Sequence, residues 1–199
     1  MINHKSFKFL FVVILFLSTV VLCCGYSNNE IFRFNKKNFY LNISSLNLSG
    51  GYINTYLKKG QTSDNWDEAV IIHYNPISYD VKPECEKLHR VVENMYIKYY
   101  SNKQMPIAIA YNRMTNTALL DFVVPSMEHS AKRLNMIEYH AFKYQKNKDS
   151  YGIKIFQYSK HIKVNNFNDE RFLYDYWCRI RKTVLPEIID MEIPKIQKR

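Results

Sequence analysis

Hydrophobic and polar positions alternate along much of the chain after its first 25 residues, and polar turns such as Gly50-Gly51 and Asn112–Asn116 separate the alternating segments. A period of two places successive side chains on opposite faces of a sheet, so the pattern predicts strands. The strands are expected at residues 31–34, 40–48, 52–57, 66–74, 105–111, 117–124, 134–145 and 151–162.

Two other segments have a helical period. In Pro83–Ser101, apolar residues recur at steps of three and four, at Cys85, Leu88, Val92, Met95 and Tyr99. The second helix is expected to begin after Asn168, a candidate N-cap, and to be closed by Pro186. Its apolar stripe consists of Leu173, Tyr176, Trp177, Ile180 and Val184.

Strands joined by short turns favour an antiparallel sheet, and helices in the middle and at the end of the chain can cover opposite faces of it. We therefore expect one α+β domain at residues 40–190, with a largely antiparallel sheet of about six or seven strands and a central and a C-terminal helix packed on it. Residues 26–39 are expected to be a polar lead, and residues 191–199 a basic tail.

This order of elements resembles that of small exported bacterial proteins of the PsbP-like α/β/α sandwich group. The shared features are a polar loop leading into Asn65-Trp66-Asp67-Glu68 and an apolar strand, the central helix, two late hairpins and a terminal helix. Members of that group are mostly non-enzymatic accessory proteins, so the resemblance implies a non-catalytic role. It carries over no functional residue, because it rests on element order.

The stretch Phe7–Leu22 is apolar except for Lys8, Ser18 and Thr19. A basic start, a short apolar run and small residues after it are typical of an export signal, predicted here at residues 1–25. The apolar run is shorter than the roughly 20 residues of a spanning helix, which favours cleavage over an uncleaved anchor. We therefore expect an exported protein, periplasmic, secreted or membrane-anchored by lipid.

The end of this leader, Val21–Gly25, resembles a bacterial lipoprotein signal, in which the residue after the cut is an acylated cysteine. That residue would be Cys24. The usual pattern has Gly, Ala or Ser before the acylated cysteine, whereas this chain has Cys23.

The chain is basic, with a formal net charge of +10, and 15% of its residues are aromatic. A basic exported domain could contact anionic headgroups, acidic polysaccharide or nucleic acid. The lysines and arginines are scattered and no recognition motif accompanies them, so nucleic acid is not an expected partner. A protein or envelope partner is expected instead.

Cys85 and Cys178 remain after the leader is removed, and they form either one disulfide or two free buried thiols. Only His89 lies four residues from Cys85, so no metal site is expected. No glycine-rich phosphate loop is present beyond Gly50-Gly51, and no cofactor is expected.

Four residues are candidates for acid–base catalysis: His73, Asp121, Glu138 and His140. Each lies in a predicted strand, where a carboxylate close to a histidine would have a shifted pKa. Each could equally face solvent, because the sequence does not show which strands are neighbours. No nucleophile motif accompanies them.

Tyrosine and tryptophan are concentrated in the two helices, at Tyr96, Tyr99, Tyr100, Tyr174, Tyr176 and Trp177. Those that remain exposed would favour protein or glycan contacts, and the others would pack at the sheet edge. The expected function is therefore an exported, non-catalytic cell-envelope protein with a binding or assembly-accessory role. The alternatives are a small exported enzyme with a His/carboxylate site and a secreted host-directed effector.

Overall fold

The computed structural model describes residues 22–24, 30–46, 50–99, 106–125, 136–148, 151–163 and 170–194. The strands are β1 (Leu22–Cys24), β2 (Ile31–Phe34), β3 (Lys37–Leu46), β4 (Tyr52–Leu57), β5 (Glu68–Asn75), β6 (Ile107–Asn112), β7 (Thr117–Pro125), β8 (Met136–Lys146) and β9 (Ile153–Lys163). The helices of the described part are α2 (Val81–Tyr99) and α3 (Glu170–Asp190).

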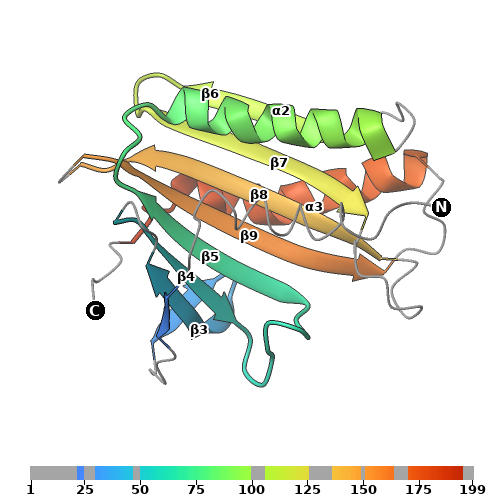
Figure 1. Ribbon diagram of the computed structural model, residues 1–199. Helices are drawn as coiled ribbons and strands as arrows, with labels where there is room; N and C mark the ends of the chain where they lie inside the picture. Colours follow the sequence, from blue (N-terminus) through green and yellow to red (C-terminus); the bar gives the residue numbers. More distant parts are fainter. Residues whose placement is uncertain are drawn as a thin grey trace.

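One antiparallel sheet dominates the structure, with the strand order β1-β3-β4-β5-β9-β8-β7-β6 and with β2 paired to β3 off this path (Figure 1). The prediction of an α+β domain with a sheet of about six or seven strands is therefore wrong. The sheet has eight strands along its path, and more residues lie in strands than in helices. The additional strands come from segments predicted to be a leader and a polar lead.

The two helices pack on opposite faces of the sheet (Figure 1). On one face, the Cys85 thiol of α2 is hydrogen-bonded to Tyr111 of β6. On the other, Arg181 of α3 pairs with Asp121 of β7. Tyr111 lies opposite Ala118 of β7. Ala118 and Asp121 are three residues apart on that strand, so their side chains lie on opposite faces of the sheet. We call these faces the α2 face and the α3 face.

The β2–β3 hairpin folds back over the α3 face. Its buried Phe34 packs against Phe156 and Tyr158 of β9, with ring centroids 5.1 and 5.2 Å apart. The backbone N–H of Asn35 in the turn donates to Glu187 of α3 over 2.8 Å. The expected polar lead thus contributes to the core, because Phe34 and Phe39 are both buried.

Helix α3 continues through Pro186, so the prediction that this proline closes the helix is wrong. The extra turn buries Ile188 completely, which offsets the backbone hydrogen bond that proline cannot make. The buried Lys143 of β8 donates to the carbonyl oxygens of Ile189 and Met191, 2.7 and 2.5 Å away. This lysine therefore caps the negative end of the helix dipole. The predicted N-cap, Asn168, lies outside the described residues.

The ends of the chain also differ from expectation. Leu22–Cys24, the end of the predicted leader, pairs with β3 as strand β1, and the rest of the leader lies outside the described residues. In the predicted basic tail, Ile193 is fully buried and accepts a hydrogen bond from Lys154 through its carbonyl. None of the described helices is long and apolar enough to cross a lipid bilayer.

Candidate functional site

Three of the four predicted acid–base residues lie on one connected chain of hydrogen bonds on the α2 face. Glu138 and His140 are next-but-one neighbours on β8, and His73 on β5 joins them through side chains of β9. We call the whole set the histidine row; it consists of His73, Gln157, Ser159, His140, Glu138 and His161.

The row crosses three neighbouring strands. His73 Nε2 lies 3.3 Å from Gln157 Oε1, and Gln157 Nε2 donates to Ser159 Oγ over 2.9 Å. Ser159 Oγ lies 2.8 Å from His140 Nδ1. The β8–β9 register makes these contacts, because it sets His140 opposite Ser159. All six side chains thus share one face of the sheet.

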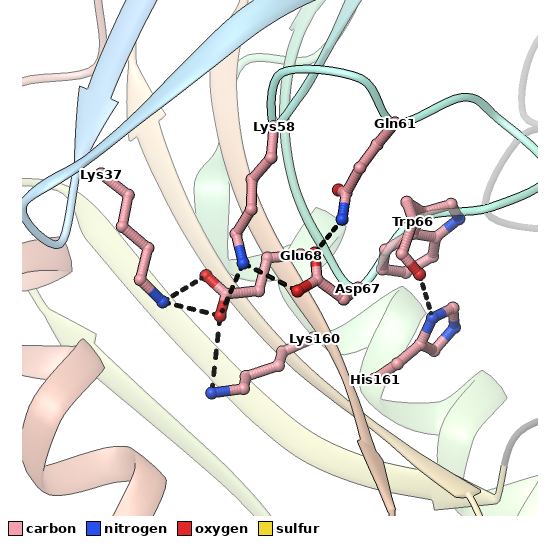
Figure 2. Close-up of polar contacts among 8 residues, drawn as sticks. All are labelled: Lys37, Lys58, Gln61, Trp66, Asp67, Glu68, Lys160 and His161. Atoms are coloured by element: carbon pink, nitrogen blue, oxygen red, sulfur yellow. Dashed lines mark hydrogen bonds and ion pairs between the residues drawn. The ribbon is translucent and has the colours of Figure 1, made fainter.

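Glu138 lies at the end of the row and is held from two sides. Its Oε2 is 3.3 Å from His140 Nε2, and its Oε1 is 3.2 Å from His161 Nε2. The other ring nitrogen of His161 donates to the carbonyl oxygen of Trp66 over 2.7 Å. The indole ring of Trp66 also stacks on the His161 ring, with centroids 3.9 Å apart (Figure 2).

These partners set the direction of the hydrogen bonds along the row. Both nitrogens of His161 lie within hydrogen-bond distance of oxygen acceptors, and His140 lies between Ser159 and Glu138. The amide nitrogen of Gln157 donates to Ser159, so the amide oxygen accepts from His73, and the donors from His73 onward point towards Glu138.

The pKa values of the two end groups agree with this arrangement. Burial would raise the pKa of Glu138, but hydrogen bonds from His140 and His161 outweigh it and hold the pKa well below its ordinary value. At the other end, burial lowers the pKa of His73 to about 4, although the contact with Gln157 opposes the change. Glu138 is therefore an anion and His73 a neutral ring at neutral pH.

Ser159, His140 and Glu138 are linked in the order nucleophile, base and carboxylate, which resembles the arrangement of serine hydrolases. Two features argue against that chemistry. Ser159 is only 1% exposed. Strands β8 and β9 each have a neighbour on both sides, so their N–H groups are engaged in the sheet instead of forming an oxyanion hole.

Sequence reasoning missed Ser159, Gln157 and His161. Their alternation along β9 was visible, since the polar residues Gln157, Ser159 and His161 occupy every second position there. Their partners were not visible, because they depend on the register of the β8–β9 hairpin.

Asp121 does not join the row. It lies on the α3 face, where its Oδ2 is 2.9 Å from Arg181 Nε. Burial raises the pKa of Asp121 to about 6, although Arg181 and Trp177 act in the opposite direction. The guanidinium carbon of Arg181 also lies 4.3 Å from the ring centroid of Trp177. Asp121 is therefore part of the contact between sheet and helix, with the sheet between it and the histidines.

Cys85 and Cys178 are both free thiols. They belong to α2 and α3, on opposite faces of the sheet, so the disulfide considered from the sequence is not formed. Burial and the nearby Glu86 raise the pKa of Cys85 to about 12. Cys24 belongs to β1, and its acylation stays a prediction. Within the described ranges, no group of three or more His, Cys, Asp or Glu side chains is placed to hold a metal ion.

A second polar cluster lies where β5 begins, on the α3 face (Figure 2). Oε1 of the buried Glu68 lies 2.7, 3.4 and 3.6 Å from the ammonium groups of Lys37, Lys58 and Lys160. Lys58 also pairs with the exposed Asp67 over 2.8 Å. We call the three lysines the lysine triad.

Electrostatics keep this cluster fully charged. Burial would raise the pKa of Glu68, but the hydrogen bonds and charge of Lys37 and the charges of the other two lysines lower it. Burial would lower the pKa of Lys58, but its contacts with Asp67 and Glu68 raise it. The cluster thus holds three ammonium groups against two carboxylates.

Exposed aromatic residues gather at the opposite end of β5, together with an exposed isoleucine. Ile77, Tyr79 and Tyr151 are 63%, 63% and 76% exposed. Tyr79 and Tyr151 meet edge to face with centroids 5.6 Å apart, and Tyr52 packs on Tyr74 at 5.1 Å. We call these five residues the tyrosine end.

The helical aromatic residues named from the sequence are mostly covered. Tyr96 and Trp177 are buried, and Tyr176 packs against the core. Tyr174 alone of the described four is largely exposed. The side chains of Tyr99 and Tyr100 lie outside the described part.

A protein-family model matches residues 26–193, which is most of the chain, so the chain belongs to that family. No curated protein and no solved structure matches the chain. The resemblance to the PsbP-like group stays a prediction.

Proposed function

We propose that this member of the family matched over residues 26–193 acts outside the cytosol as a non-catalytic binding or assembly-accessory protein. The observation that carries the proposal is the tyrosine end, where Ile77, Tyr79 and Tyr151 are each more than half exposed, Tyr79 packs on Tyr151, and Tyr52 packs on Tyr74. Clustered exposed aromatic side chains are enriched in protein interfaces.

Contacts with β5 also hold Tyr151 of the tyrosine end in place, and such preorganisation reduces the entropy lost when a partner binds. Tyr74 Oη donates to the carbonyl oxygen of Tyr151 over 2.7 Å. Gly152 lies so close to β5 that a Cβ there would be 2.5 Å from the carbonyl oxygen of Asn75. Tyr151 and Gly152 are thereby held against the end of β5. An aliphatic Ile77 among tyrosines favours a protein partner over a glycan.

The test compares capture of envelope proteins by the purified chain and by three variants. Tyr79→Ser and Tyr151→Ser each remove one exposed ring, and Tyr174→Ser removes an exposed ring from α3 as a matched control. We expect proteins captured by the wild type to be retained by Tyr174→Ser and reduced about tenfold by the other two, since aromatic residues dominate interface energy. Equal capture by all four proteins would contradict the proposal.

A small exported hydrolase remains the second candidate, because Ser159, His140 and Glu138 are bonded in series. Its test is hydrolysis of activated ester substrates by the purified chain. Turnover that disappears in Ser159→Ala, with thermal stability retained, would favour this candidate. We expect no turnover above that of Ser159→Ala.

A further inference from the structure

The lysine triad is a cluster that its own acidic residues do not neutralise. Lys37, Lys58 and Lys160 come from the start of β3, the residue after β4 and the middle of β9, so the fold and not the sequence brings them together (Figure 2). All three ammonium groups lie within 3.6 Å of one oxygen of Glu68. With Asp67 included, one positive charge remains.

Glu68 acts as the organiser of the cluster. It is only 3% exposed, so it must be paired, and Lys37 alone makes contacts of 2.7 and 2.8 Å with its two oxygens. The other two lysines lie farther from Glu68, at 3.4 and 3.6 Å. Like charges held this close repel one another, and a further anion would relieve the repulsion.

The lysines can still donate to such an anion. Their side chains are 40%, 26% and 35% exposed, so the cluster lies partly open to solvent. An ammonium group has three N–H donors, and on each lysine the contacts with Glu68 and Asp67 use fewer than three of them. The net charge of +10 attracts anions to the surface as a whole.

We infer that the lysine triad, held by Glu68, binds a phosphate group. Lysine binds phosphate as a point charge, so the contact does not depend on one orientation of the phosphate oxygens. The group could belong to a free phosphate or to the headgroup of an anionic lipid, and both present the same oxygens. This inference goes beyond the proposed function and does not depend on the tyrosine end.

The first measurement titrates inorganic phosphate into the purified chain and follows the ε-methylene NMR signals of lysine. We expect the signals of Lys37, Lys58 and Lys160 to shift together and saturate, while that of Lys148 stays in place. Lys148 is the control because it also pairs with a glutamate, Glu192, at 3.3 Å. Equal shifts at all lysines would overturn the inference.

The second measurement uses substitution. Lys160→Gln removes the most distant contact with Glu68 and leaves Lys37 to pair the buried carboxylate, so the variant is expected to fold. It should weaken phosphate binding about tenfold, as expected for loss of a charge-assisted contact. Lys160→Arg should restore most of the binding, and Lys148→Gln should not change it. Unchanged binding in Lys160→Gln would overturn the inference.

The source of the phosphate is distinguished by vesicle flotation. One set of vesicles contains phosphatidylcholine alone, and the other also contains phosphatidylglycerol. Flotation with the second set only, lost in Lys160→Gln, identifies the lipid headgroup as a source. Phosphate-dependent shifts without flotation identify a free phosphate. If phosphate causes no NMR shifts and the protein floats with neither set of vesicles, the inference is overturned.

Discussion

Replacing Glu138 with glutamine should destabilise the protein strongly, because Glu138 is the acceptor for two histidines inside the sheet. The substitution keeps the shape and removes the charge. His161 would keep its contact with Trp66 but lose the anion that its second N–H faces. An amide group would also present a donor to one of the two rings that now donate to carboxylate oxygens.

The free energy of unfolding is expected to fall by about 3–5 kcal/mol, the range found when one partner of a buried ion pair is removed. That is a large part of the roughly 5–15 kcal/mol by which domains are stable. For a chain of this size it corresponds to a fall in Tm of about 6–20 °C. The assay is urea unfolding followed by tryptophan fluorescence at neutral pH, since Trp66 stacks on His161.

The same variant should change the acid sensitivity of the protein. The folded-state pKa of Glu138 is lowered, so its contribution to stability is present above its unfolded pKa of about 4.3 and is lost as the pH falls below that value. Wild-type stability should therefore fall on acidification more steeply than that of Glu138→Gln. The control Glu192→Gln removes an exposed ion pair with Lys148, and it should cost less than about 1 kcal/mol. A loss below 1 kcal/mol in Glu138→Gln, with the wild-type acid slope retained, would refute the reasoning.

Four further outcomes follow from buried or strained groups. Because burial raises the pKa of Cys85 to about 12, timed alkylation at about pH 8 should label Cys178 well before Cys85, and equal rates would contradict that burial. The NMR titration of His73 should have a midpoint near pH 4, and a midpoint above about 6 would exclude its buried contact with Gln157. Gly152→Ala should cost about 1–3 kcal/mol in urea unfolding, since φ is +105° and the new Cβ would meet a backbone oxygen at 2.5 Å; a loss below about 0.5 kcal/mol would show that β5 does not pack there. Lys143→Met should cost about 1–3 kcal/mol in the same assay because it leaves the two carbonyls at the end of α3 without their donor, and a neutral result would show that water replaces it.

The elements that could be predicted were those with a strong local period. The stripe from Cys85 to Met95 identified α2 to within two residues at its start, because a helical face repeats within a few turns. The strands from Tyr52 onward were also located by local pattern. The pattern located a strand at residues 31–34 but not its contribution to the core, since two buried phenylalanines among lysines and asparagines have little local signal.

The candidate sites depended on information that no local pattern contains. Glu138 faces His161 only because the β8–β9 turn sets that register, and a shift by one residue would move every side chain to the other face. The lysine triad brings Lys160 of β9 to Lys37 and Lys58, about 100 residues or more earlier in the chain. Pro186 was expected to end α3, but tertiary burial of Ile188 overrides the local preference.

A binding role at the tyrosine end can be tested in cells with a photo-crosslinking amino acid placed at position 79, 151 or 174 of the full chain. We expect one discrete crosslinked species, recovered with the envelope fraction, from positions 79 and 151 and none from position 174. Crosslinks from position 174 alone, or none from any position in a chain shown to be exported, would contradict the proposed role.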